Sequence, residues 1–543
     1  MASALYTTPI PVNEPVRSYA PGTPEREAIK ARLDEMAKEP VDIPLVIGGK
    51  DVRTGETEEL CMPHDHGHVL GTWHKAGPDE IRAAIAATRK AWGEWASWPW
   101  EERAAVFLKA ADLLAGPWRD TVNAATMLGQ SKTIHQAEID AACELVDFWR
   151  FNVHFAEKIY EEQPMSAPGM WNRMDHRPLE GFVYAVTPFN FTSIGGNLPT
   201  APAIMGGVSI WKPSRTSILS NYYVMRVLQE AGLPDGVVNF MLGSGGPITE
   251  ALVTSRDFAG LHYTGSTEVF QMLWGRISDN LRNYRNYPRI VGETGGKDFV
   301  LAHASCDVRE LVTALVRGAF EYQGQKCSAV SRAYVPRSIW PQVEEGLAEM
   351  VSSIKMGDPR DFRNFMCAVI DEGAFKKIGL YIEEAKNGDD MEIVLGGGCE
   401  GDKGWFVEPT VVLSKEPKTR LMCEEIFGPV LTVHVYPDGK WRETLGLVDA
   451  TSEYALTGAV FARERRAIDE AARALRYTAG NFYINDKPTG AVVGQQPFGG
   501  GRASGTNDKA GSRLNLIRWI SPRSIKETHA PPKDYRYPFM EGK

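Results

Sequence analysis

The stretch "FVYAVTPFNFTSIGGNLPTAPAIMGGVSIWKPS" runs from Phe182 to Ser214 and decides the fold. Its two ends, 182–188 and 208–213, are short apolar runs that each stop at a proline, and a segment of small residues separates them. Apolar runs of this length, bounded by turn residues, are typical of strands that are buried on both faces of a sheet. The stretch therefore predicts two strands of a covered sheet.

The same alternation continues toward the C-terminus. Helical spacing over 220–232 ends at a glycine, and further strands and helices follow in turn. Strands joined by helices of this length require right-handed crossovers, which build a parallel sheet. The expected elements are a strand at 237–242, a helix from Pro247, a strand at 260–266, a helix at 267–281 and a strand at 289–293.

A second series of alternating elements begins near Gly295. Its expected members are a strand at 297–302, a helix from Asp307 to about Gln325, a strand at 332–336, a helix to Ile354 and a strand at 428–436. We therefore predict an α/β protein in which two α/β units meet near Gly295.

The N-terminal side is predicted to be helical after an extended start. Residues 1–45 are interrupted by prolines and predict an arm around a short helix from Pro24 to Lys38. Helical spacing from Asp79 to Gly116 predicts one helix that ends at Gly116 and Pro117, and a second helical stretch covers Gly129 to Glu157.

Composition excludes several classes of function. The chain has 543 residues, of which 43% are hydrophobic and 24% charged, the balance of a globular protein. A formal charge of −9, without an arginine-rich stripe or a zinc-finger spacing, argues against a nucleic-acid partner. No run of about 18 apolar residues predicts a membrane span. The seven cysteines include no C-x-x-C pair and the N-terminus has no apolar core like that of a signal peptide, so we expect reduced thiols and a cytoplasmic protein.

Glycine-containing and polar segments follow the predicted strands. Ligands bind beyond the carboxyl ends of the strands of an open α/β sheet, and backbone amides at a helix N-terminus can hold a phosphate. A single glycine turn is usually only a turn. Several in series make a nucleotide site the better interpretation. The segments are "TPFN" (187–190), "KPS" (212–214), "GSGG" (243–246), "TGSTE" (264–268) and "ETGGKD" (293–298).

Three residues near these segments suit chemistry at a carbonyl. Cys327 lies among small polar residues in "YQGQKCSAVSRAYV" (322–335), Glu293 ends a predicted strand, and Asn190 lies in a strand-end loop. A thiolate can attack a carbonyl, an amide can stabilise the oxyanion and a carboxylate can activate water. The ordinary alternatives are a buried cysteine and a solvated carboxylate. Spacing alone does not show that the three meet.

Two further clusters could be mistaken for metal sites. "HDHGH" (64–68) places alternate histidines on one face of a strand, but no fourth ligand lies nearby, and a hydrophilic hairpin turn explains it. "CEEIFGP" (423–429) has two adjacent acids, which fit an exposed loop. We predict no metal.

In chain order, "TPFNF", "WKPS", "TGSTE", "ETGGKD", "GQKCS", "EEIFGP" and "QQPFGG" resemble the aldehyde dehydrogenase superfamily, from about residue 45 to residue 530. "HQAEIDAACELVDFWRFN" (135–152) and "NDKPTGAVVGQQPFGGGRASGTNDKAG" (485–511) are similar to the branch that oxidises L-glutamate 5-semialdehyde, which forms when 1-pyrroline-5-carboxylate opens by hydrolysis.

The resemblance implies a fold with a Rossmann-type NAD-binding domain, an α/β catalytic domain and a small β oligomerisation flap. It also implies a homodimer or a dimer-based oligomer. The implied divisions are an N-terminal arm (1–45), the NAD-binding domain (46–157 and 181–294), the catalytic domain (295–514), and the oligomerisation hairpin (158–180) with a C-terminal strand and tail (515–543).

The resemblance also implies roles for individual residues. Cys327 would be the nucleophile, Glu293 the base for the hydrolytic water, and Asn190 an oxyanion donor together with the backbone N–H of Cys327. The implied NAD contacts are Thr187, Pro188, Phe189, Lys212, Gly265, Ser266, Glu425 and Phe427. The implied substrate contacts are Glu144 near the α-amino group, Phe191 and Phe498 around the aliphatic part, and Ser328, Gly490 and Ala491 at the α-carboxylate.

Three positions depart from the family pattern. Phe270 stands where the phosphate turn often ends in glycine, and Ala491 stands where some relatives have a serine hydroxyl. Arg215 replaces the acid that many NAD-specific relatives use to repel a 2′-phosphate, so NAD rather than NADP rests on the resemblance.

The implied function is NAD-dependent oxidation of glutamate semialdehyde, the second step of proline breakdown, with a possible link to proline dehydrogenase. Two alternatives stay open. One is a dehydrogenase of the same superfamily for another aldehyde, and the other is a non-catalytic nucleotide-binding scaffold. The presence of Cys327, Glu293 and Asn190 together favours an enzyme, since losing any one would disable catalysis without structural cost.

Overall fold

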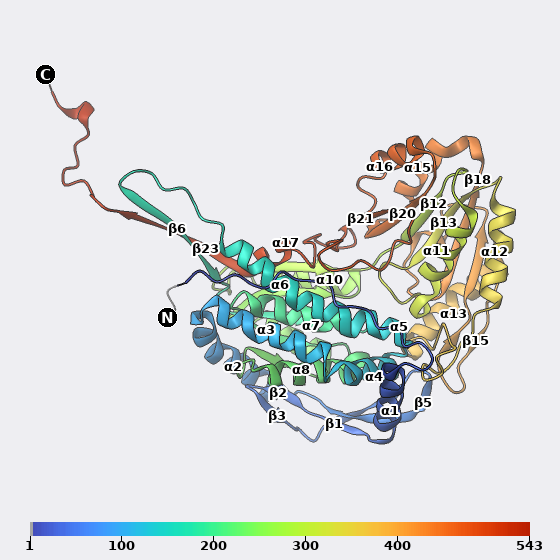
Figure 1. Ribbon diagram of the computed structural model, residues 1–543, viewed down its shortest axis with the longest axis horizontal. Coiled ribbons are helices and arrows are strands. Elements are labelled where there is room, and N and C mark those ends of the chain that lie inside the picture. Colours follow the sequence, from blue (N-terminus) through green and yellow to red (C-terminus); the bar gives the residue numbers. More distant parts are fainter. Residues whose placement is uncertain (1–3, 543) are drawn as a thin grey trace.

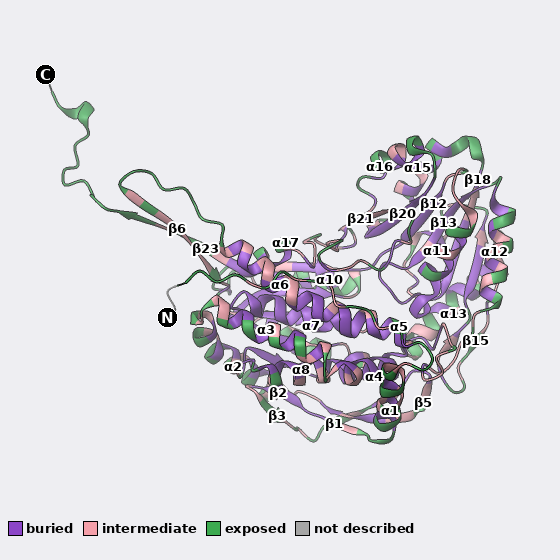
Figure 2. Ribbon diagram, in the orientation of Figure 1, coloured by how far each residue is buried: buried purple, intermediate pink, exposed green. Residues whose placement is uncertain are grey.

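A computed structural model describes residues 4–542 and has two lobes, each built around a seven-stranded sheet (Figure 1). The interiors of both lobes are buried, and exposed residues lie on their outer helices and loops (Figure 2). The α/β fold class is confirmed. The sheet of the first lobe has the order β11 (Arg289–Glu293), β10 (Phe258–Thr264), β7 (Phe182–Val186), β8 (Val208–Lys212), β9 (Val238–Phe240), β2 (Leu45–Ile47) and β3 (Lys50–Val52).

The strands from β11 to β9 run parallel, and β2 and β3 add an antiparallel edge. The chain passes from β7 to β8 and β9 on one side, then crosses back to place β10 and β11 on the other side of β7. The strand order therefore reverses between β7 and β10, where ligands of such sheets bind. The helices of this lobe are α2 (Pro78–Ser97), α3 (Trp100–Ala115), α4 (Arg119–Gln130), α5 (Ile134–Ala137), α6 (Leu145–Tyr160), α7 (Thr192–Ile204), α8 (Ile218–Ala231), α9 (Gly245–Val253) and α10 (Thr267–Asp279).

The second lobe repeats the architecture with a mostly parallel sheet and one antiparallel edge strand, β14. Its strand order is β14 (Met391–Leu395), β17 (Thr410–Ser414), β18 (Val430–Tyr436), β13 (Val330–Pro336), β12 (Asp298–Ala302), β20 (Thr457–Phe461) and β21 (Asn481–Ile484). Its helices are α11 (Val308–Phe320), α12 (Trp340–Ser352), α13 (Glu372–Asn387), α14 (Arg420–Cys423), α15 (Trp441–Thr451) and α16 (Arg465–Ala474). Short pairs join β15 (Cys399–Glu400) with β16 (Phe406–Val407), and β19 (Tyr454–Ala455) with β22 (Gly501–Arg502).

The helical N-terminal part differs from the expectation in two places. The single helix expected from Asp79 to Gly116 is two helices, α2 and α3, because Pro99 lacks the N–H and holds Trp98 in an extended conformation. The stretch expected from Gly129 to Glu157 is divided as well. There α4 ends at Ser131 in a left-handed conformation, and a π-helix, η1 (Glu138–Glu144), precedes α6.

Helix α7 lies where the sequence shows only small residues. It is buried on all sides, so it has no polar face and no amphipathic period. Its glycines permit close packing: a Cβ on Gly195 would lie 2.1 Å from Asn221 Oδ1, and one on Gly196 would lie 2.7 Å from the Leu145 methyls. The small residues of this segment therefore allow α7 to pack closely against its neighbours, and they do not indicate a loop.

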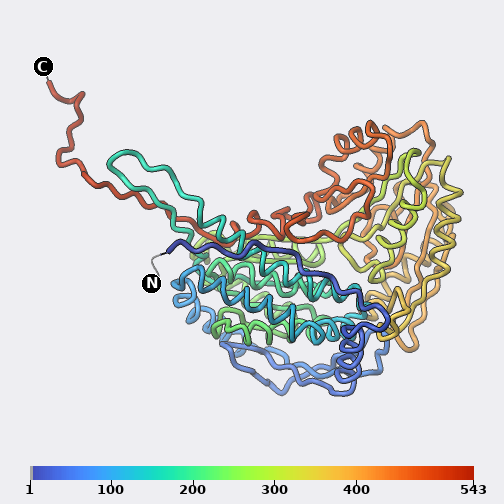
Figure 3. The backbone as a smooth tube through the Cα atoms, viewed as in Figure 1, coloured from blue at the N-terminus to red at the C-terminus, as the bar shows by residue number. Residues whose placement is uncertain are grey.

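The N-terminal segment is held against the first lobe, where it runs beside α6 (Figure 3). Thr8 N donates to Glu157 at 2.6 Å, and Asn13 Nδ2 donates to Asp147 at 2.8 Å. Helix α1 (Pro24–Lys38) has the expected bounds. The next residues are already in a sheet, because β1 (Val41–Ile43) pairs with β5 (Asp65–His74), which pairs with β4 (Thr57–Met62).

A two-stranded ribbon projects from the first lobe, and the C-terminal tail continues beyond it (Figure 1). It pairs β6 (Met170–Pro178) with β23 (Ile520–Thr528), which follows α17 (Arg513–Leu516). The segment expected as a hairpin over 158–180 thus contributes one strand, and its partner comes from the C-terminus. Residue 158 itself lies inside α6. No helix among residues 4–542 combines the length and the apolar character that a bilayer crossing requires.

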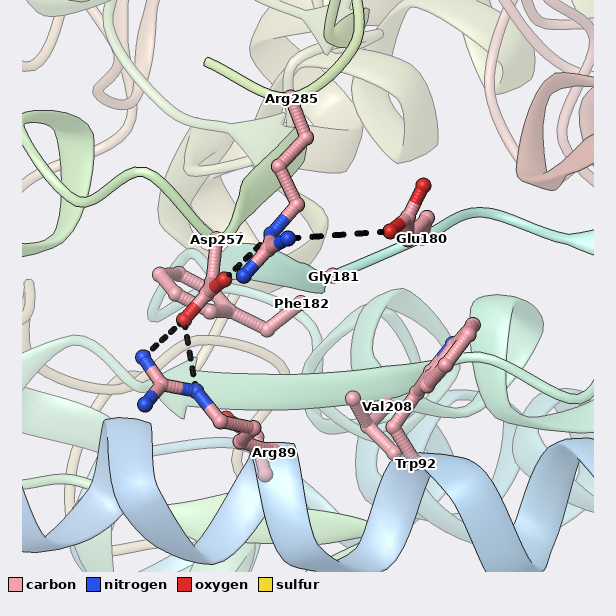
Figure 4. A pocket seen from close by; sticks show the side chains of 9 residues that line it. Arg89, Trp92, Glu180, Gly181, Phe182, Val208, Asp257 and Arg285 are labelled. Carbon is pink, nitrogen blue, oxygen red and sulfur yellow. Dashed lines mark hydrogen bonds and ion pairs between the residues drawn. The ribbon is translucent and has the colours of Figure 1, made fainter. Parts of the chain in front are cut away.

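A cavity lies at the amino ends of β7, β8 and β10, opposite the ends that carry the glycine segments (Figure 4). Asp257, just before β10, accepts hydrogen bonds from Arg89 Nε at 2.9 Å and Arg285 Nε at 2.8 Å. Its backbone oxygen accepts from Phe182 N at 2.9 Å. This ionic cluster ties α2 and the segment before β11 to the sheet, and we interpret it as structural.

Candidate functional site

The predicted cofactor loop 187–190 follows β7, at the point where the strand order reverses. Hydrogen bonds from neighbouring elements hold it. Thr187 N donates to Lys212 O at 3.1 Å, and Trp211 Nε1 donates to Thr187 Oγ1 at 3.0 Å. Ser217 Oγ donates to Pro188 O at 3.3 Å, and Gln130 Nε2 donates to Phe189 O at 2.5 Å. The loop is therefore fixed before any ligand arrives.

Gly265 and Ser266 form the turn from β10 into α10. A Cβ on Gly265 would lie 2.5 Å from Tyr263 Oη, so this position requires glycine. Ser266 caps the helix by accepting from Val269 N. Phe270, the departure from the family pattern, is buried and stacks on Tyr263 with ring centroids 5.4 Å apart. It also fills the space beside Gly292, where a Cβ would lie 2.1 Å from the Phe270 ring.

Lys212 ends β8 and suits an anionic or hydroxyl-rich ligand. Burial lowers its pKa, and no acid in the described part of the chain offsets that effect. Its hydrogen bond within the described residues is to Pro213 O at 3.3 Å. An ammonium group without an acid partner, beside a glycine turn and a helix N-terminus, fits a dinucleotide better than it fits a structural role.

Two predicted cofactor residues come from the second lobe. Glu425 Oε1 accepts from Gly296 N at 2.9 Å, and burial raises its pKa. Phe427 has a positive φ of 60°, and its ring meets that of Phe189 edge-on at 5.7 Å. These contacts join the loops of the two lobes, so the predicted cofactor residues line a shared region between them.

A strained turn positions Cys327. The residues before it form η3 (Glu321–Gly324), in which Tyr322, Gln323 and Gly324 have φ values of 51°, 55° and 65°. Two consecutive non-glycine residues in the left-handed region cost about 1–3 kcal/mol each, so the surroundings must enforce them. Gln323 supplies this constraint: its side chain donates to Ser131 O at 3.1 Å and to Ala368 O at 2.7 Å, and accepts from Cys367 N at 3.0 Å.

The thiol of Cys327 points at the carboxylate that ends β11. Sγ lies 3.9 Å from Glu293 Oε1, within the range of a thiol hydrogen bond. Burial raises the pKa of Cys327 well above its ordinary value, and the charge of Glu293 adds to the effect. Burial also raises the pKa of Glu293 to about 7, although Lys509 and the thiol act in the opposite direction. The pair is thus a neutral thiol beside a carboxyl group that can accept its proton near neutral pH.

Asn190, from the first lobe, reaches the loop that carries Cys327. It is buried, and its Nδ2 donates to Gln325 O at 3.1 Å, two residues before the cysteine. An amide nitrogen carries two N–H groups, so one remains for an oxyanion. The three residues predicted to act on a carbonyl therefore lie around one loop.

The predicted substrate residues fall into two groups. Ser328 Oγ donates to Thr489 Oγ1 at 2.9 Å, which brings the loop of Gly490 and Ala491 beside the cysteine. Phe498 lines a cavity together with Glu293 and Lys509. The second group belongs to the first lobe: the Phe191 ring stacks on the Lys132 ammonium at 4.5 Å, and Glu144 Oε2 lies 2.6 Å from Ser193 Oγ.

Sequence reasoning missed several charged residues of this region. Lys509 faces Glu293, and Asp140 and Lys132 form a buried ion pair at 2.7 Å behind Glu144. Lys509 is within the quoted stretch 485–511 and Asp140 within 135–152, but only the fold shows what they face. The histidine cluster 64–68 belongs to the β4–β5 hairpin, where His64 is buried and its Nδ1 lies 3.2 Å from Ser131 Oγ.

Known proteins resemble this chain over nearly its whole length. The model of the aldehyde dehydrogenase family matches residues 51–524. The chain is 54% identical, over 98% of its length and 96% of the relative, to "Delta-1-pyrroline-5-carboxylate dehydrogenase, mitochondrial" of Dictyostelium discoideum. It is 48% identical, over 97% of its length and 94% of the relative, to the human protein of that name. The crystal structure of the Delta-pyrroline-5-carboxylate dehydrogenase from Mycobacterium tuberculosis bound with NAD is similar over 100% of both chains, with a TM-score of 0.97 and 53% identity.

Proposed function

The chain belongs to the aldehyde dehydrogenase family, and on that premise we propose that it oxidises L-glutamate 5-semialdehyde to L-glutamate with NAD. This is the second oxidation of proline breakdown. The substrate forms when 1-pyrroline-5-carboxylate opens by hydrolysis. The observation that carries the proposal is the contact of 3.9 Å between Cys327 Sγ and Glu293 Oε1 in the region shared by the two lobes.

The chemistry follows from the groups around the thiol. Glu293 takes the proton of Cys327, and the sulfur forms a bond to the aldehyde carbon. The oxygen that becomes negative is stabilised by the side-chain amide of Asn190 and the backbone N–H of Cys327. The aldehyde hydrogen leaves as a hydride, and a thioester remains. Glu293 first releases the proton of the cysteine to solvent and then removes a proton from water, which attacks the thioester. Glutamate leaves, and the proton now held by Glu293 returns to the sulfur and restores the thiol.

NAD supplies the hydride acceptor when it is bound. Residues of this chain fit it: Lys212 offers an ammonium group that has no acid partner among residues 4–542, and Gly265 and Ser266 offer a tight turn at a helix N-terminus. Glu425 and Phe427 approach from the second lobe, and Thr187, Pro188 and Phe189 form the held loop between them.

The loop 488–491 and the side chains near it suit the substrate's polar end. Gly490 has a positive φ of 93°, and Ser328 is linked to the loop through Thr489. We assign the carboxylate to the backbone N–H groups of this loop. Phe191 and Phe498 flank the aliphatic part. Ala491 lacks the hydroxyl of some relatives, so the backbone carries this recognition.

The division of the chain follows from the same reasoning. An arm (1–45), an NAD-binding domain (46–157 and 181–294) and a catalytic domain (295–514) leave 158–180 and 515–543 as an oligomerisation flap. The projecting pair of β6 and β23 supports a homodimer that buries this flap. A cytoplasmic location and a link to proline dehydrogenase complete the proposal. Cell fractionation and co-purification test these two points.

The decisive experiment replaces the nucleophile. Cys327→Ala should abolish NADH formation from glutamate semialdehyde, while NAD affinity measured by calorimetry stays within about twofold. Cys306→Ala, a cysteine of the second lobe away from Glu293, is the matched control and should keep its activity. Oxidation of the semialdehyde by Cys327→Ala at a rate near that of the wild type would disprove the assignment. A panel with aldehydes that lack the α-carboxylate separates this function from that of other family members.

A further inference from the structure

In the first lobe, a chain of hydrogen bonds joins Glu144 to the buried ion pair of Lys132 and Asp140. Ser193, at the start of α7, has its Oγ 2.6 Å from Glu144 Oε2 and 2.8 Å from Asp140 Oδ1. Asp140 and Glu144 both belong to the π-helix η1. A π-helix inside a longer helical stretch is frequent at functional sites, and here it places two acids four residues apart on one serine.

The number of hydrogens in this chain decides which acid is charged. A serine hydroxyl carries one proton, so it can donate to only one of its two carboxyl neighbours. Asp140 already accepts from Lys132 Nζ at 2.7 Å, Thr192 N at 3.1 Å and Ser193 N at 3.0 Å. An ammonium and two backbone N–H groups aimed at one carboxyl group stabilise its ionised form, and we therefore assign Asp140 as the anion that takes the Ser193 proton.

The remaining contact then requires a proton from the other side. Two oxygens 2.6 Å apart without a hydrogen between them would repel each other, so Glu144 must donate to Ser193. The charges agree with this assignment. Burial raises the pKa of Glu144 to about 8, and the negative charges of Asp140 and Glu293 add to the effect, with the Ser193 contact and Lys132 opposing it.

We propose that Asp140 and Ser193 hold Glu144 as a neutral acid in the empty site, and that Glu144 releases its proton when the α-ammonium group of the substrate binds beside it. This inference rests on the proposed function, because it requires an aldehyde that carries an α-amino group. A buried ammonium needs an anion nearby, and Glu144 can supply one only by losing its proton. Asp140 and Ser193 are positioning residues that act through Glu144.

The groups that face Glu144 come from several elements of the fold. Asp140 lies on its own element, Lys132 in the loop between α4 and α5, Ser193 on α7 and Glu293 at the end of β11. Lys132 is itself held between the rings of Phe191 at 4.5 Å and Tyr322 at 4.4 Å and has Asp140 as its ion partner. Because this ammonium is committed to Asp140, the positive charge that ionises Glu144 must come from the ligand.

The neutral acid also has a role in selectivity. An aldehyde without an α-amino group leaves Glu144 neutral. An α-amino aldehyde forms an ion pair with Glu144 after the acid has lost its proton. The apparent affinity for the α-amino substrate should therefore depend on the fraction of Glu144 that is ionised. Because the pKa of Glu144 is raised, this fraction is small at low pH and increases as the pH rises through about 8.

The test is the pH dependence of KM for two substrates. For glutamate semialdehyde, KM should fall about fiftyfold between pH 6 and pH 8, the ratio that a group of pKa about 8 produces. For glutarate semialdehyde, which lacks the α-amino group, KM should change much less. Both substrates share Glu293, so its ionisation cancels in the comparison. Glu144→Gln, which has the same shape, should remove the difference between the two pH profiles.

Ser193→Ala gives the proposal its sharpest test. If Glu144 donates to Ser193, the substitution removes a bond made to the neutral acid, and the KM inflection moves to lower pH. If Ser193 instead donates to an ionised Glu144, the inflection moves to higher pH and the proposal is overturned. A KM profile in Glu144→Gln that matches the wild type overturns it as well.

A measurement on the unmodified protein tests the proposal even if the substituted proteins do not fold. Calorimetric titration with L-glutamate at pH 7, in two buffers of different ionisation enthalpy, should show release of nearly one proton, and titration with glutarate should show none. Absence of L-glutamate binding or of proton release overturns the proposal. Failure of the proposed function is seen separately, as absence of NADH formation from the semialdehyde at every pH.

Discussion

The ionisation of Glu293 makes a quantitative prediction about the rate of thioester hydrolysis. With a pKa of about 7, the carboxylate fraction is about one in eleven at pH 6 and about ten in eleven at pH 8. In the proposed mechanism Glu293 activates water only as a carboxylate, so the deacylation rate should rise about tenfold across this interval. An exposed glutamate of ordinary pKa, about 4.3, would be almost fully ionised throughout and would produce no change.

The assay is rapid mixing of enzyme and NAD with glutamate semialdehyde while NADH absorbance is followed. When deacylation is slow, one equivalent of NADH forms in a burst and the slower steady rate reports hydrolysis. The burst should become more pronounced as the pH falls from about 8 to about 6, since the steady rate decreases by the tenfold factor derived from the pKa. Glu293→Gln should leave a thioester that does not hydrolyse, with little steady turnover at any pH.

Two results would refute this reasoning. A steady rate that is independent of pH between 6 and 8 would mean that Glu293 is already ionised and that burial does not govern its pKa. Normal steady turnover by Glu293→Gln would mean that another group activates the water.

Three further predictions concern other parts of the molecule. Asn190→Ala should lower kcat about 100- to 1,000-fold, measured as steady NADH formation, because an oxyanion donor is lost; a loss below tenfold would contradict that role. Arg215 is exposed near Lys212, the lysine proposed to bind the cofactor, so the wild type should turn over with NADP. Arg215→Glu should reduce kcat/KM for NADP at least tenfold more than for NAD, and an unchanged ratio would exclude this residue from cofactor selectivity. Asp257→Ala should lower the free energy of unfolding by about 1–2 kcal/mol in urea titrations, a modest value because Arg89 and Arg285 are largely exposed. Burial alone would raise the pKa of Asp257, but the two arginines lower it by a larger amount, so the net pKa is below its ordinary value. The stabilisation is therefore present at neutral pH and should disappear as the pH falls below about 4.

Strands were easier to predict than helices, for a physical reason. A strand buried on both faces is a short apolar run, and the run alone locates it: β7 and β11 have nearly the expected bounds. Helix α7 has no comparable signal, because a helix surrounded by protein needs small residues and not an amphipathic period. The break at Pro99 was readable in principle, since a proline within a helical pattern stops the helix before it.

The candidate site shows a similar limit. Residue types were enough to select Cys327, Glu293 and Asn190, because each type has few uses at a carbonyl. Their meeting depends on the left-handed conformations of Tyr322 and Gln323, which L-residues rarely adopt and which no sequence pattern signals. The contacts that enforce these conformations come from Ser131, Cys367 and Ala368, distant in the chain.

Three ionisable groups of the proposed site, one thiol and two carboxyl groups, share one property. The pKa of Cys327, of Glu293 and of Glu144 is raised in each case chiefly by burial, so the empty site holds protons where catalysis needs anions. A site in this state is stable without ligands, because it avoids unpaired buried charges. It is also unreactive: a neutral thiol does not attack and a neutral Glu293 does not activate water. The positive charge of an ammonium-bearing substrate changes this balance at Glu144, since it favours the ionised form of the acid beside it. Selectivity for an α-amino aldehyde and the stability of the ligand-free site therefore have the same origin, the burial that keeps Glu144 protonated until the right ligand arrives.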